Sequence, residues 1–252
     1  MPRTKFEATF RAFVEGFGGE SVPEEADRSA DYFFPRHNVV AELKCLVVDQ
    51  TADAFNKLNQ ITGQRRVAPQ PEQPGPDAIL LPSTSANGEK FSIPFDKSFQ
   101  QACQRVLLTP IEKIIRAANQ QIRATKERMS IPSAHGVVLI FNEGNPLHAA
   151  SPQHFARLAG EVIQKPLQSG ERRFPYIQGM VYFSFRTIET LDEQAQKYMP
   201  FWLPAQVSGD AVEEIRRFQD DLKQGWYRYV EKMSGVPVVG LHRETGWPEP
   251  RR

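Results

Sequence analysis

The stretch Val39-Val40-Ala41-Glu42-Leu43-Lys44-Cys45-Leu46-Val47-Val48 predicts a central β-strand. Successive side chains of a strand point to opposite faces, so the odd and even positions form separate sets. The odd set is apolar throughout, whereas the even set carries Glu42 and Lys44 between apolar ends. Charged side chains are almost never fully buried unless they are paired. This interruption of an apolar strand is the most informative feature of the sequence.

The segment before this strand supplies a second acidic group. Residues Ala30 to Phe34 predict a short strand, and Pro35 to Asn38 predict the turn that follows it. A hairpin of the two strands brings the Asp31 carboxylate beside Glu42. Two carboxylates a few ångströms apart repel each other, which raises the pKa of one of them unless a cation lies between them.

Two interpretations of these three charged residues are open. A hard divalent ion such as Mg²⁺ binds carboxylate oxygens, backbone carbonyls and water, and a lysine beside it can orient or activate a water molecule. Alternatively, Glu42 and Lys44 form a structural ion pair on a partly exposed sheet face, and Asp31 is a turn residue. Spacing and strand pattern do not decide between the two.

The rest of the chain predicts alternating helices and strands, and therefore an α/β protein. Phenylalanines at helical spacing predict an amphipathic helix over residues 3 to 17. We expect residues 1–234 to form one domain with a loop insertion at about 64–97 and a Pro-rich tail over 235–252. The other expected elements are helix 51–61, strand 79–81 with a hairpin turn at 87–88, helix 98–129 broken near Thr109-Pro110, strand 135–141, helix 151–164, strand 177–185 and helix 210–233.

Composition excludes several classes of protein. The 252 residues hold 31 basic and 30 acidic side chains and two cysteines, which argues against an indiscriminate polyanion binder and a disulfide scaffold. Neither a signal-like apolar start nor a membrane-length apolar run is present, so we expect a cytoplasmic protein. Phosphate-loop, dinucleotide-binding, zinc-protease and serine-hydrolase motifs are also absent, and the five histidines are scattered.

The even net charge hides two segments of opposite sign. Residues 1–53 hold six basic and ten acidic side chains, and residues 104–128 hold six basic and two acidic ones. The basic segment lies on a predicted helix, where solvated charges are common. It also offers candidate contacts to nucleic-acid phosphates. These are Lys113, Arg116, Arg123 and Lys126.

The sequence Ala30-Asp31-Tyr32-Phe33-Phe34, followed by Val39-Val40-Ala41-Glu42-Leu43-Lys44, resembles the PD-(D/E)XK, or restriction endonuclease-like, nuclease superfamily. The family signature is an Asp on one strand and Glu-x-Lys on the next, after an N-terminal helix. Ala30 stands where the family usually has proline. The resemblance implies a restriction endonuclease-like core with a mixed central sheet flanked by helices and a C-terminal helical elaboration.

The same resemblance implies a role for each residue of the motif. Asp31 and Glu42 would bind Mg²⁺ or Mn²⁺, the Leu43 carbonyl would assist, and Lys44 would position the attacking water. Many members also use a Glu of the first helix, for which Glu7 is better placed than Glu15 or Glu20.

We therefore expect a metal-dependent endonuclease that hydrolyses nucleic-acid phosphodiesters and acts on DNA rather than RNA. We expect no membrane partner. A homodimer is compatible with this expectation. One alternative is a non-catalytic binding or assembly protein that retains the fold and keeps Glu42 and Lys44 as an ion pair. Another is a hydrolase of smaller phosphoesters.

Overall fold

The computed structural model describes residues 5–23, 29–47, 51–64, 79–84, 90–95, 97–143, 152–184, 201–206 and 211–235. Its contacts divide the chain into two units. The core unit comprises Met1–Val48 with Ile114–Arg252, and the inserted unit comprises Asp49–Lys113. The segment set apart from the core is therefore wider than the insertion expected at 64–97.

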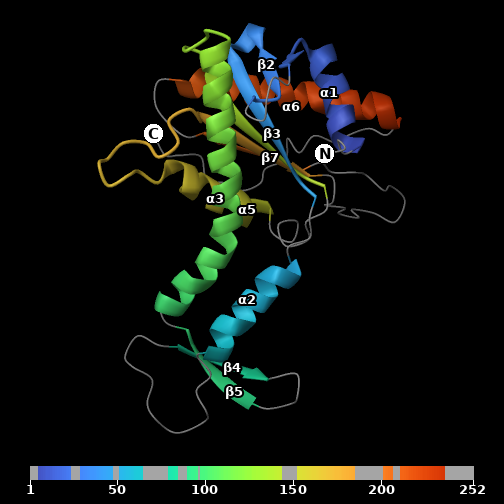
Figure 1. Ribbon diagram of the computed structural model, residues 1–252. Helices are drawn as coiled ribbons and strands as arrows, with labels where there is room; N and C mark the ends of the chain where they lie inside the picture. The colour runs from blue at the N-terminus through green and yellow to red at the C-terminus, as the bar shows by residue number, and fades with distance from the viewer. Residues whose placement is uncertain are drawn as a thin grey trace, which may run out of the picture. The chain divides into compact units, whose positions relative to one another are not determined.

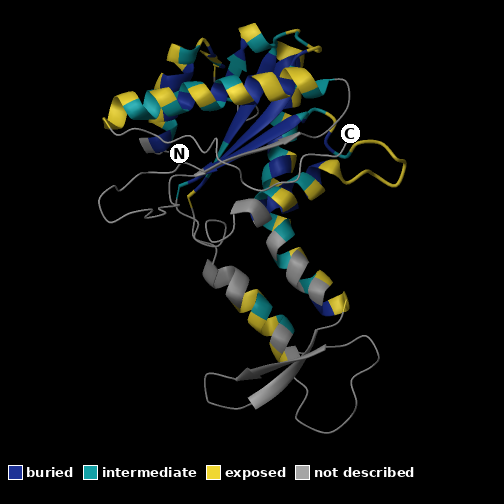
Figure 2. Cartoon of the chain, turned by 180° about the vertical axis from the view of Figure 1, so that it is seen from behind, coloured by how far each residue is buried: buried dark blue, intermediate teal, exposed yellow. Residues whose placement is uncertain are grey.

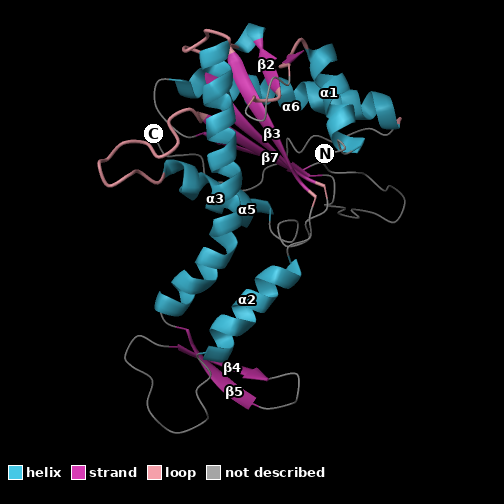
Figure 3. Ribbon diagram, viewed as in Figure 1, coloured by secondary structure: helices cyan, strands magenta, loops and turns pink. Residues whose placement is uncertain are grey.

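The core unit is built on one mixed sheet. Within the described residues its strand order is β1-β2-β3-β6-β7-β8, with β3, β6 and β7 parallel to one another and the remaining pairs antiparallel. This arrangement confirms the α/β class with a mixed sheet flanked by helices (Figure 1 and Figure 3). The strands are β1 Glu20–Ser21, β2 Tyr32–Phe34, β3 Val39–Leu46, β6 His135–Asn142, β7 Gly179–Ser184 and β8 Phe201–Gln206.

Helices cover both faces of this sheet. The odd-numbered side chains of β3 lie on the face of the sheet that α1 and α6 cover. The even-numbered side chains of β3 lie on the face that α3 and α5 cover. The helices are α1 Lys5–Phe17, α3 Lys97–Arg128, α5 Pro152–Gln164 and α6 Val212–Ser234, with a 3₁₀ turn η1 at Pro35–His37. Residues 114–128 of α3 belong to the core unit.

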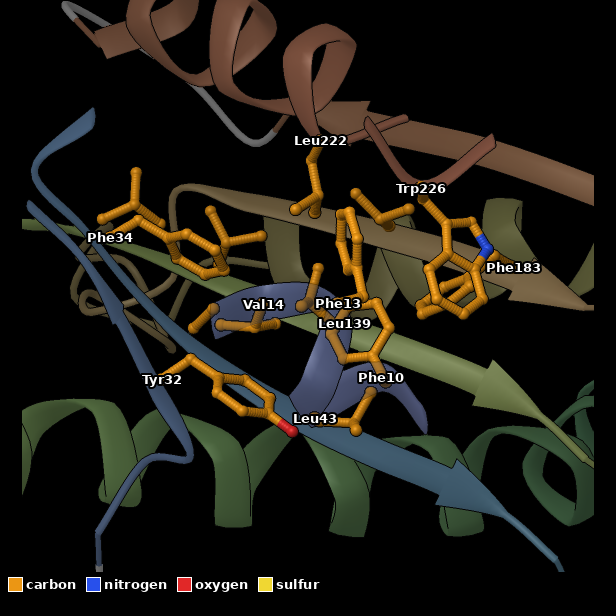
Figure 4. Close-up of a cluster of buried hydrophobic side chains, with 14 of the residues drawn as sticks. Phe10, Phe13, Val14, Tyr32, Phe34, Leu43, Leu139, Phe183, Leu222 and Trp226 are labelled. Carbon is orange, nitrogen blue, oxygen red and sulfur yellow. The ribbon is translucent and has the colours of Figure 1, made fainter. Parts of the chain in front are cut away.

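An aromatic core fills the space between the sheet and the helices α1 and α6 (Figure 4). Gly225 lets α6 approach α1, because a Cβ atom there would lie 2.7 Å from a ring carbon of Phe17. The central strands β3, β6 and β7 are largely buried, whereas the outer face of α6 is exposed (Figure 2). The aromatic core consists of Phe6, Phe10, Phe13, Val14, Tyr32, Phe34, Val39, Ala41, Leu43, Val137, Leu139, Phe141, Val181, Phe183, Ile215, Phe218, Leu222 and Trp226.

The β2–β3 hairpin sets the register of the charged residues. Tyr32 pairs with Ala41 and Phe34 with Val39, and Asn38 closes the turn in the left-handed region with φ 51°. Strand β2 starts two residues later than expected. The reason is that the backbone N–H of Ala30 donates to the hydroxyl of Thr125 on α3, at 2.7 Å, instead of to a neighbouring strand.

Three expectations about the elements were wrong or incomplete. Helix α3 is continuous through Pro110, so the expected break is wrong. The Thr109 hydroxyl donates to the Arg105 carbonyl one turn back, at 2.8 Å, and does not cap a new helix. Strands β1 and β8 were not expected at all.

The inserted unit contains α2 Thr51–Gln64 and an antiparallel pair, β4 Ile79–Thr84 with β5 Lys90–Phe95. The expected turn at 87–88 and the tail after Gly235 lie outside the described residues. In the part of the chain that the structure describes, no helix is both long and apolar enough to cross a membrane.

Candidate functional site

The hairpin brings Asp31, Glu42 and Lys44 together. Continuing the β2–β3 register by one residue places Asp31 opposite Glu42. The Leu43 backbone N–H donates to Asp31 Oδ2 at 2.9 Å. Lys44 Nζ lies 2.6 Å from Glu42 Oε1. All three side chains are thus fixed by contacts within or beside the hairpin, as a localised charged site requires.

Glu42 is the most deeply buried of the three. Only 2% of its side chain is exposed, and within the described residues no N–H group or hydroxyl donates to its buried Oε2 atom. Burial raises the pKa of Glu42 to about 8, and the negative charge of Asp31 and a side-chain hydrogen bond with Asp31 add to this effect against the attraction of Lys44. Burial also raises the pKa of Asp31. Both carboxyl groups therefore resist ionisation, and a cation bound between them would relieve both penalties.

The oxygen atoms at this site suit a hard divalent cation. The N–H and C=O groups of a strand residue point to the same edge, and the Leu43 N–H points to Asp31. The Leu43 carbonyl therefore faces that edge too, beyond the start of β2. Glu42 Oε2, the Asp31 carboxylate and this carbonyl are oxygen donors of the type that Mg²⁺ binds, with water completing its shell. Across the described ranges no group of three or more His, Cys, Asp or Glu side chains is placed to hold a metal ion.

The first helix contributes an acidic residue near this site. Glu7 on α1 is half-buried, and its negative charge contributes to the raised pKa of Asp31, as the smallest of the causes. The other two candidates, Glu15 and Glu20, are exposed. Glu7 is thus the acidic residue of this region whose charge reaches Asp31.

Sequence reasoning missed Gln121, which lies on α3. Its Oε1 accepts a hydrogen bond from Lys44 Nζ at 2.7 Å, and its Nε2 donates to the Ser29 carbonyl at 3.3 Å. Lys44 is therefore held between Glu42 and Gln121. The only sequence signal is a polar residue at the margin of the apolar stripe of α3, and such residues are common.

Helix α3 also holds the backbone that leads into Asp31. Thr125 accepts from the Ala30 N–H, as described above, and Arg128 Nη1 donates to Ser29 Oγ at 2.6 Å. Gln121, Thr125 and Arg128 follow one another at helical spacing along one side of α3. This side of the helix fixes Ser29 and Ala30, and through them the position of Asp31.

Two of the four predicted phosphate contacts lie at the ring of Tyr176. Lys113 is exposed in the inserted unit, and Arg116 is exposed in the core unit. Arg123 and Lys126 lie beside Tyr176, with Arg123 Cζ 5.8 Å and Lys126 Nζ 5.7 Å from the ring centre. Arg123 also pairs with Glu127 at 2.8 Å. Lys126 is only 7% exposed, and burial lowers its pKa.

The arrangement thus combines two buried carboxyl groups, a lysine held by a glutamine and a backbone carbonyl at the open edge of a hairpin. Comparison of the chain with protein-family models, with curated proteins and with solved structures found no significant match.

Proposed function

We propose that this protein is a Mg²⁺-dependent nuclease with a restriction endonuclease-like core, which hydrolyses nucleic-acid phosphodiesters and prefers DNA to RNA. The observation that carries the proposal is Glu42, a buried carboxyl group with one oxygen on Lys44, directly opposite the second buried carboxyl group, that of Asp31. Burial of an acidic side chain lowers the stability of the fold, and a cation-dependent reaction gives a functional reason for this acidic residue.

The metal would be held by Asp31, Glu42 and the Leu43 carbonyl, with Glu7 as the further acidic group nearby. When bound, Mg²⁺ polarises a phosphoryl oxygen and lowers the pKa of a coordinated water molecule. In the hydrolysis, the oxygen of a water molecule loses a proton and forms a bond to phosphorus, the bond from phosphorus to the leaving oxygen breaks, and the leaving oxygen takes up a proton.

Lys44 contributes an oriented positive charge to this reaction. A lysine ammonium group has three N–H donors, and two of them are used by Glu42 and Gln121. The third has no partner among the described residues, and the side chain is 24% exposed. It can therefore donate to the attacking water or to a phosphate oxygen, while Gln121 keeps the ammonium group in place.

The short Glu42–Lys44 contact also favours a second candidate function. In that alternative the two residues form a structural ion pair in a non-catalytic binding or assembly protein of the same fold. The alternative predicts that removing either partner lowers stability without affecting any metal-dependent property.

Cleavage assays separate the two candidates. Plasmid, single-stranded DNA and RNA are incubated with the protein in Mg²⁺ or Mn²⁺, beside the variants Glu42→Ala and Lys44→Ala. Glu127→Ala, which removes an exposed carboxylate of α3, is the matched control. We expect Lys44→Ala to lose roughly 10²–10⁴-fold in rate, Glu42→Ala to lose at least as much, and the control to cleave normally.

Cleavage that persists unchanged in both site variants would refute the site assignment. If the wild-type protein cleaves no nucleic acid and its melting temperature does not change with Mg²⁺, the structural ion-pair alternative is favoured.

A further inference from the structure

The cationic side chains near the C-terminus of helix α3 contact two different parts of the core unit. Arg123 and Lys126 lie at the Tyr176 ring, and Arg128 lies at Ser29. Arg123 and Arg128 are five residues apart, which separates them by about 140° around a helix of 3.6 residues per turn. Arg128 shares its side of α3 with Gln121, which holds Lys44. Of these three cations, Arg128 is therefore the one on the side of the candidate metal site.

The Arg128 guanidinium retains most of its binding capacity. The side chain is exposed, and its one hydrogen bond among the described residues runs from Nη1 to Ser29 Oγ. A guanidinium group has five N–H donors in a planar fork that fits phosphate oxygens. Arg123 pairs with Glu127, whereas no carboxylate of the described residues pairs with Arg128. Within the described residues its positive charge is therefore available to an external anion.

We propose that Arg128 binds a backbone phosphate of the nucleic-acid strand that enters the site at Asp31 and Glu42. The proposal rests on the proposed nuclease function and adds a residue that the sequence did not single out. Ser29 lies two residues before Asp31, and its hydroxyl fixes one edge of the guanidinium. A phosphate on the remaining N–H groups would lie beside the backbone that positions Asp31.

Arg128 also has a purely structural explanation. It stands in the last turn of α3, where a cation interacts favourably with the helix dipole, and it ties Ser29 to the helix. The two roles differ in their dependence on salt. A phosphate contact releases counterions, so its loss weakens binding to every sequence and reduces the slope of log affinity against log salt by about one.

The test measures binding of fluorescent single-stranded and duplex DNA to the full chain, without divalent ions and over a range of salt concentrations. The variants are Arg128→Gln, the matched Arg123→Gln on the other side of α3, and Ser29→Ala. Ser29→Ala removes the hydrogen bond between Ser29 and Arg128 and keeps the guanidinium group. We expect Arg128→Gln to bind roughly tenfold more weakly, with a salt slope lower by about one. Arg123→Gln should bind like the wild-type protein, and Ser29→Ala should lose less affinity than Arg128→Gln and keep the wild-type salt slope.

Several outcomes would overturn the inference. Unchanged binding by Arg128→Gln refutes the phosphate contact, and so does an equal loss in Arg123→Gln. If Ser29→Ala reproduces the whole loss, the role of Arg128 is the structural tie. A wild-type protein that binds and cleaves DNA while Arg128→Gln binds normally refutes this inference alone. A wild-type protein that binds no nucleic acid refutes the proposed nuclease function with it.

Discussion

The two faces of strand β3 differ in what they bury. The odd-numbered face packs Val39, Ala41 and Leu43 into the aromatic core under α1 and α6. The even-numbered face buries Glu42 beside Lys44, under α3. The first face stabilises the fold by removing apolar surface from water. The second face buries an acidic group whose ionised form is disfavoured by desolvation, and such departures from a consistent apolar core are expected at functional sites.

The largest effect on stability should come from the aromatic face. Leu139 on β6 is fully buried beside Leu43, and Leu139→Ala should lower the free energy of unfolding by about 2–5 kcal/mol because it leaves a cavity. Urea unfolding with and without Mg²⁺ measures this loss. The variant should still gain stability from Mg²⁺, since Leu139 lies on the face away from the carboxyl groups. A variant that no longer responds to the ion would show that the two faces are not independent.

Glu42 should make stability depend on pH in the opposite sense to an ordinary salt-bridged acid. Its pKa is raised to about 8 in the fold, from 4.5. Between these values the folded chain keeps a proton that the unfolded chain releases, so increasing pH favours unfolding. In metal-free buffer the melting temperature of the wild-type protein should therefore fall, relative to Glu42→Gln, as the pH rises from about 5 to 8.

The comparison with Glu42→Gln cancels the titration of the groups that do not interact with Glu42. If the melting temperatures of the two proteins change in parallel across this pH range, Glu42 is ionised in the fold. That result would count against a site that disfavours the charge of Glu42.

The smallest effect should come from the helix that supports the even-numbered face. Gln121→Ala removes the partner that holds Lys44, and loss of such an outer-shell contact should reduce cleavage roughly tenfold. Gln120→Ala is the matched control, because Gln120 is the neighbouring glutamine of the same helix and is exposed. Steady-state cleavage rates and melting temperatures of both variants decide the point. Equal rates in the two variants would remove Gln121 from the site.

Local patterns predicted the elements that depend on neighbouring residues. The period of two in Val39 to Val48 predicted both faces of β3, and the phenylalanine spacing of residues 3 to 17 predicted α1. Strand β8 was not predicted because its antiparallel pairing with β7 defines it, and because it contains Pro204, which is unfavourable in a strand. The expected break at Pro110 failed because one proline removes a single N–H donor from a helix of 32 residues.

The residues of the candidate site also divide into those that local sequence patterns predicted and those that only the structure identified. Asp31, Glu42 and Lys44 lie within fourteen consecutive residues, so strand period and a hairpin were enough to bring them together in prediction. Gln121 contacts Lys44 across 77 positions of sequence, and Arg128 contacts Ser29 across 99. The sequence by itself determined which residues share a face, because the backbone period is local. Only the tertiary structure decided which side of α3 meets the hairpin, because helix packing depends on side chains from the whole core unit.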